Sequence, residues 1–130
     1  MAQKEIEVIL TRQLASYLAM PILIIDTAGT LVFYNEPAEV ILGSRFEETG
    51  EISADEWAQI LIVTDEQGTP LAPQTRPMLI ALTEQRPVHC EIWGQGLDHV
   101  RRHIEITAFP LISQAGRRLG AVAIFWEVEK

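Results

Sequence analysis

Cysteine is nearly absent from this 130-residue sequence, and no apolar segment is long enough to cross a bilayer. The lone thiol, Cys90, excludes an internal disulfide and suits a reducing compartment, and we expect it to pack within a strand. The longest apolar runs, 21–25 and 121–126, are far shorter than the roughly 20 residues of a transmembrane helix, and we find no signal sequence at the start. These absences predict a cytoplasmic segment without direct membrane contact.

Basic residues are few as well. The chain has 10 Lys and Arg against 18 Asp and Glu, which gives a formal net charge of -8. A charge of this sign repels phosphate backbones and anionic headgroups, so nucleic acid is disfavoured as a partner. Hydrophobic residues make up 48% of the chain and charged residues 22%, as in globular proteins, and the length suits one hydrophobic core.

Motifs for catalysis are also missing. No nucleophile lies in a Gly-x-Ser-x-Gly turn, and Gly94-Gln95-Gly96 lacks the third glycine of a nucleotide-binding loop, so we interpret it as a hairpin turn. His89 and Glu91 share a strand face, either as a proton or anion site or as a solvent-facing pair. The sequence predicts that the protein is not an enzyme. A small α+β enzyme that uses His89 or Glu91 is the least favoured alternative.

The first part of the chain predicts a helix followed by a hairpin. Residues 3–19 contain neither glycine nor proline, and their apolar side chains recur at three- and four-residue spacing, which indicates an amphipathic helix that ends before Pro21. Apolar runs at 21–26 and 31–34 predict two strands. The segment 26–29, Asp-Thr-Ala-Gly, has the composition of a tight turn between them.

Short helices are predicted next. Asn35 fits the N-cap of a helix of about two turns, and Gly43 is placed to end it. The stretch 45–62 is the least clear part of the sequence. Within it, Ser53 and Glu56 resemble a capping box that opens another short helix.

The second half of the chain predicts one more helix and three strands. Thr75 is expected to cap a helix that reaches about Gln85. The strands are expected at 88–93, about 100–111, and 119–128. Alternate residues of the last strand are apolar on both faces, so a second element must cover the outer face of the sheet. The N-terminal helix, from this chain or from a partner, is the expected cover.

Several short motifs occur together in a characteristic order. They are Asp26-x-x-Gly29, Tyr34-Asn35 before a helix with Ala38 and Gly43, Asp65-x-x-Gly68, Pro77 with Ala81-Leu82, Ala108-Phe109-Pro110-Leu111, Gly116, and Gly120-Ala121-Val122. Their order and spacing resemble the PAS family over residues 18–128. One departure is Glu127-Val128-Glu129 at the end, where PAS domains commonly have Asp-x-Thr.

The resemblance implies an α+β fold: a five-stranded antiparallel sheet with short helices on one face and an N-terminal amphipathic helix. Residues 1–19 would then be a signalling or dimerisation helix, and 20–130 the PAS domain. PAS domains often belong to histidine kinases, second-messenger enzymes or transcription regulators. We therefore expect a sensor domain from a longer signal-transduction protein, which regulates an attached effector.

Metal and cofactor ligands are not evident. His99 and His103 are four residues apart on an expected strand, which spans about 13 Å, too far to share one ion. Haem-binding PAS domains usually take a histidine from the helix that here runs 75–85, and this helix offers only Met78, which we expect in the core. Photochemistry of the LOV kind needs a helical cysteine, whereas Cys90 is in an expected strand. A flavin held without that cysteine, beside Trp57, stays open as an alternative.

Two functions follow from the resemblance, and both can hold at once. In the first, a small molecule binds between the helices and the sheet, in a cavity lined by Trp57, Met78, Leu82, Ile104, Ile106 and Phe125. In the second, the chain is a ligand-free interaction module that forms a homodimer through Ile6, Leu10, Leu14, Tyr17, Leu18, Ile124 and Trp126.

Overall fold

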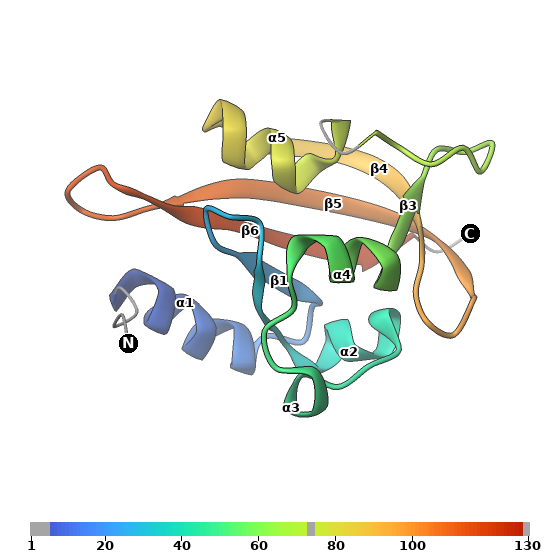
Figure 1. The fold of residues 1–130 in the computed structure, drawn as a ribbon, viewed down its shortest axis with the longest axis horizontal. Coiled ribbons are helices and arrows are strands. Elements are labelled where there is room, and N and C mark those ends of the chain that lie inside the picture. Colours follow the sequence, from blue (N-terminus) through green and yellow to red (C-terminus); the bar gives the residue numbers. More distant parts are fainter. Residues whose placement is uncertain (1–5, 73–74, 129–130) are drawn as a thin grey trace.

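The computed structural model of the protein describes residues 6–72 and 75–128. The helices of this part are α1 (Ile6–Tyr17), α2 (Glu36–Leu42), α3 (Phe46–Thr49), α4 (Ala54–Ile60) and α5 (Pro77–Glu84). The strands are β1 (Ile22–Ile25), β2 (Leu31–Tyr34), β3 (Ile62–Thr64), β4 (Val88–Gln95), β5 (Arg101–Ile112) and β6 (Arg118–Glu127). Figure 1 shows α5 and α1 on opposite sides of the long strands β5 and β6.

The strands form one antiparallel sheet in the order β2-β1-β6-β5-β4-β3. The expected α+β fold is confirmed, but the sheet has six strands where five were predicted. The additional strand, β3, has three residues and pairs with the end of β4. Three residues are too few to show the alternation by which a strand is identified in a sequence. The place of β3 in the sheet depends on its pairing with β4.

The Gly94–Gly96 segment is not the hairpin turn predicted from its composition. β4 continues through Gly94 to Gln95, and the connection to β5 follows it. A Cβ atom at Gly94 would come within 2.9 Å of the Ile104 Cδ1 atom, so glycine here permits close packing within the sheet. The glycine at position 94 does have a structural reason, but that reason is close packing against another strand and not a turn.

Most helix ends follow the predicted capping chemistry. The Asn35 side chain accepts a hydrogen bond from the Ala38 N–H, and Gly43 ends α2 in the left-handed conformation at φ 81°. Ser53 caps α4 by accepting from the Glu56 N–H. The predicted cap at Thr75 is wrong, because its hydroxyl donates to the Ala72 carbonyl and the N-cap of α5 is the next residue.

The two faces of the sheet carry separate apolar clusters. The last strand alternates as predicted, with Ala123 and Phe125 facing the main core and Val122 and Ile124 facing the other side. The main core lies between the sheet and the short helices, and α5 packs on β4, β5 and β6. On the outer face, α1 contacts β5, which supplies part of the cover that the sequence requires.

Candidate functional site

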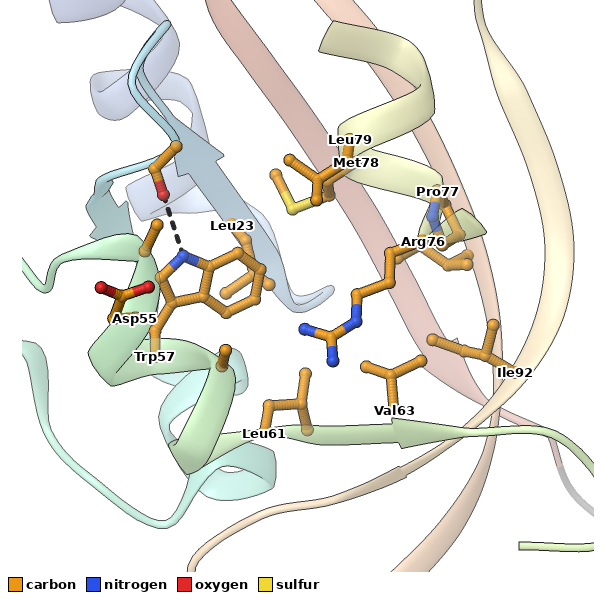
Figure 2. A pocket seen from close by; sticks show the side chains of 14 residues that line it. Leu23, Asp55, Trp57, Leu61, Val63, Arg76, Pro77, Met78, Leu79 and Ile92 are labelled. Carbon is orange, nitrogen blue, oxygen red and sulfur yellow. Dashed lines mark hydrogen bonds between the residues drawn. The ribbon is translucent and has the colours of Figure 1, made fainter. Parts of the chain in front are cut away.

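A cavity of about 200 Å³ lies between α4, α5 and the inner face of the sheet (Figure 2). Its walls are mostly apolar, and its principal residues are Trp57, Leu61, Val63, Arg76, Met78 and Ile106. This volume is below the roughly 300–1,000 Å³ of sites for drug-sized ligands, so the space suits a smaller molecule.

Trp57 forms the wall on the α4 side. Helix α4 begins at the Ser53 cap, and this start places Trp57 one turn later against the core, where it is 9% exposed. The indole Nε1–H donates a hydrogen bond of 2.9 Å to the Gly29 carbonyl oxygen, in the turn between β1 and β2. This bond fixes the ring plane and satisfies the one polar group of the indole, leaving an apolar face toward the cavity.

The opposite wall comes from the start of α5. Pro77 occupies the first turn, where its fixed φ favours the helix and its missing N–H breaks no bond. Met78 follows and is buried, with its side chain directed into the cavity (Figure 2). Leu23 on β1 and Ile92 on β4 line the floor, because both belong to the inward-facing set of their strands.

Among the described residues that line this cavity, Arg76 is the only cation. Figure 2 shows its guanidinium directed between Leu61 and Val63 toward the indole of Trp57. Its Nε atom is buried and, within the described part of the chain, has no hydrogen-bond partner. Asp55 lines the same cavity, and no ion pair joins it to Arg76. The site therefore combines an apolar space with one unsatisfied, positively charged donor.

The cavity residues predicted from the sequence divide into two groups. Trp57, Met78 and Ile106 line the cavity. Ile104 and Phe125 are instead enclosed in the core below it, and Leu82 packs at the edge of that core. Arg76 was not predicted from the sequence, because a charged residue just before a helix is ordinarily expected in solvent.

Cys90 lies in β4 and faces the main core, as expected for a strand residue. Burial raises the pKa of its thiol above the ordinary value. The described residues contain no group of three or more His, Cys, Asp or Glu side chains that would hold a metal ion. Among the described helices, none has the length and apolarity required to span a bilayer.

The predicted dimer residues occupy the outside of α1 and the outer sheet face. Leu10, Leu14 and Tyr17 point away from the sheet, and Tyr17 is 88% exposed. Helix α1 instead rests on the domain through other side chains: Val8 is buried, and the Arg12 guanidinium lies 4.9 Å from the Phe33 ring centre.

The remaining predicted interface residues are partly covered by the chain itself. Leu18 and Ile124 pack against the outer apolar cluster. Trp126 is half-buried, and its indole N–H donates to Glu105 at 2.9 Å. The side chain of Ile6 lies outside the described residues.

The histidines of β4 and β5 pair across the two strands. His89 contacts the Glu105 carboxylate at 3.2 Å, and His103 lies 3.6 Å from Glu91. The His103 ring also stacks on Trp93, with ring centres 4.3 Å apart. His89 and Glu91 therefore each face a side chain of the neighbouring strand across the sheet surface.

Comparison with solved structures identifies the fold. The PAS domain of BvgS from Bordetella pertussis has a TM-score of 0.71 at 16% identity, over 97% of this chain and 89% of that chain. The PAS domain of nitrogen regulation protein NR(II) from Vibrio parahaemolyticus has a TM-score of 0.64 at 15% identity, over 92% and 98%. The LOV protein of Rhodobacter sphaeroides has a TM-score of 0.71 at 10% identity, over 97% and 70%.

Sequence comparison adds no assignment, because no family model and no curated protein matches the chain. The structural likeness extends over nearly all of the chain and includes the antiparallel sheet and the helices that cover it. The protein therefore has the α+β fold of PAS domains.

Proposed function

We propose that this chain is the sensor domain of a cytoplasmic signal-transduction protein and binds a small molecule in the cavity beside Trp57. In this proposal, residues 20–130 form the sensing domain and residues 1–19 the helix that carries the signal. The observation that carries it is the cavity of about 200 Å³ beside the buried residues of the main core. A purely structural module has no need of such a space.

Strand β5 offers a route from the cavity to α1. Ile106 on this strand lines the cavity, while Phe109 on its other face packs in the outer cluster near α1. A ligand that binds one arrangement of the sheet better than another shifts the population toward that arrangement. The position of α1 on the outer face would then report the occupancy of the cavity.

The attached effector is proposed to be a regulated enzyme such as a histidine kinase of a two-component system, with the sensing domain itself non-catalytic. Solved domains of this fold include one from a nitrogen regulation protein. A binding role is supported by the cavity lining, which contains no Ser, Thr or Cys nucleophile among the described residues.

Native mass spectrometry of the freshly purified protein tests the sensor proposal. We expect additional mass on each chain, and we expect Ala58→Leu to remove it by filling the cavity from α4. Gln59→Leu is the matched control, because it adds the same side chain at an exposed position of the same helix. The proposal would be contradicted if wild-type protein showed no additional mass as purified and also gained none when small molecules were added.

Homodimer formation is the second proposed function. It is supported by the exposed apolar side chains of Leu10, Leu14 and Tyr17 on one helix, an arrangement that monomers seldom leave in solvent. Leu14→Asp should convert a dimer into a monomer in sedimentation velocity, because it places a charge in the middle of this surface. Val40→Asp, at an exposed apolar residue of α2, should leave the dimer intact. Unchanged association of the Leu14 variant would exclude this interface.

A further inference from the structure

The charge in the cavity indicates what kind of molecule it binds. We propose that the ligand is a small carboxylic acid with an apolar body, and that Arg76 binds its carboxylate. This inference rests on the proposed sensor function and adds the chemical class of the ligand.

The side chain of Arg76 has an unsatisfied hydrogen-bond donor. The Nε atom of Arg76 is buried and lacks a hydrogen-bond partner among the described residues, and a buried charged donor without a partner costs free energy. Arg76 is the N-cap residue of α5, and its side chain, which has donors only, makes no capping hydrogen bond. The helix start therefore does not explain the position of the guanidinium.

The direction of the Arg76 side chain also favours a ligand carboxylate. The guanidinium extends into the space enclosed by Leu61, Val63 and Trp57 (Figure 2). A carboxylate can accept two parallel hydrogen bonds from the two Nη groups of the guanidinium, in a fork arrangement that this group favours. The apolar part of the molecule would then face Trp57 and Met78, where burial of apolar surface contributes to affinity.

The charge and the volume of the cavity restrict the class of ligand further. Arg76 is the one cation among the described residues that line the cavity, so its guanidinium matches a ligand with a single negative charge. An engineered apolar cavity of roughly 150 Å³ holds benzene. A cavity of about 200 Å³ therefore suits one ring, or a short acyl chain, that bears one carboxylate.

Isothermal titration calorimetry with a matched pair of probes tests this assignment. Phenylacetate and phenylacetamide have almost the same shape and differ in charge. We expect wild-type protein to bind the acid at least about tenfold more tightly than the amide, as a charge-assisted hydrogen bond implies. Arg76→Gln should remove this preference, and Arg76→Lys should retain part of it. Ala58→Leu should abolish binding of both probes, whereas Gln59→Leu should leave it unchanged.

The Arg76→Gln protein should fold, because the substitution removes a buried Nε donor without a partner and no capping bond. Its melting temperature without ligand is expected to equal or exceed that of the wild type. A purely structural role for Arg76 would lower this temperature and would leave the preference for the acid unchanged.

The outcomes separate the two proposals. Equal binding of acid and amide, with both lost in Ala58→Leu, would keep the cavity as a ligand site and overturn the carboxylate assignment. Binding of neither probe, together with a bare native mass spectrum, would overturn the sensor function itself. A retained native ligand without an acidic group would overturn only the carboxylate assignment, and a retained acid that Arg76→Gln releases would support it.

Discussion

The indole N–H of Trp57 and the carbonyl oxygen of Gly29 are 2.9 Å apart, although 28 residues separate them in the sequence. This hydrogen bond joins α4 to the turn between β1 and β2 and sets the orientation of the cavity wall. Loss of this bond should affect both the stability of the fold and the shape of the cavity, because the same buried indole makes the bond and lines the cavity.

Trp57→Phe should therefore reduce the free energy of unfolding by about 1–3 kcal/mol, since it leaves a buried carbonyl without its donor. Chemical denaturation with urea measures this change. Trp126→Phe is the matched control: its indole N–H donates to Glu105 on the outer surface, and its loss should cost less than about 1 kcal/mol. Equal effects would show that the buried bond to Gly29 has no special weight.

Asn35 connects three segments at the start of α2. Its side-chain oxygen accepts from the N–H groups of Ile22 and Ala38, and its amide donates to the Met20 carbonyl. Asn35→Ala should destabilise the protein by about 2–3 kcal/mol, because it removes a cap and strands a buried N–H. Ser53→Ala, at an exposed cap, should cost about 1 kcal/mol or less in the same urea titration.

Gly96 lies against the backbone of α2. A Cβ atom at this position would overlap the Ile41 carbonyl oxygen, which belongs to backbone and has little room to move. Gly96→Ala should cost about 3 kcal/mol, near the upper range for overpacking. Gly68→Ala is the comparison: its φ of 87° is strained for alanine, but no atom lies within 4 Å, so about 1 kcal/mol is expected. Thermal unfolding of both variants would contradict this reasoning if Gly68→Ala were the less stable.

Cys90 should make stability decrease in alkaline solution. Burial raises the pKa of its thiol in the folded protein, so the unfolded chain releases this proton at lower pH than the folded one. The stability that the protonated thiol contributes is complete below the pKa of this thiol in the unfolded chain. It is lost as pH rises through the pKa of the thiol in the folded protein. Urea titrations from neutral to alkaline pH should show a steeper decline for wild type than for Cys90→Ala. Parallel declines would mean that the thiol titrates alike in both states.

Local chemistry explains which parts of this fold were predictable. The side chain of Asn35 and the flexibility of Gly43 act within a few residues of their own position, so the start and end of α2 follow from the sequence. The alternation in β6 is equally local, and it correctly required apolar cover on both faces.

The covering helix shows where local patterns become insufficient. Its three- and four-residue periodicity predicted a helix, but the periodicity alone does not say which surface the apolar side chains meet. In the structure Val8 is buried against the domain while Leu14 is 60% exposed. The docking of Arg12 on Phe33, a contact between distant segments, accompanies this orientation.

The sequence by itself determined the order of most elements and the apolar nature of both sheet faces, because propensity, capping and periodicity depend on neighbouring residues. The α+β class was implied by the resemblance of its motifs to the PAS family. Only the tertiary structure decided that β3 joins the sheet, that Gly94 serves close packing, and that Arg76 points into the cavity. These features depend on contacts between residues far apart in the chain. Their free energies appear only when the elements pack, so no local pattern records them.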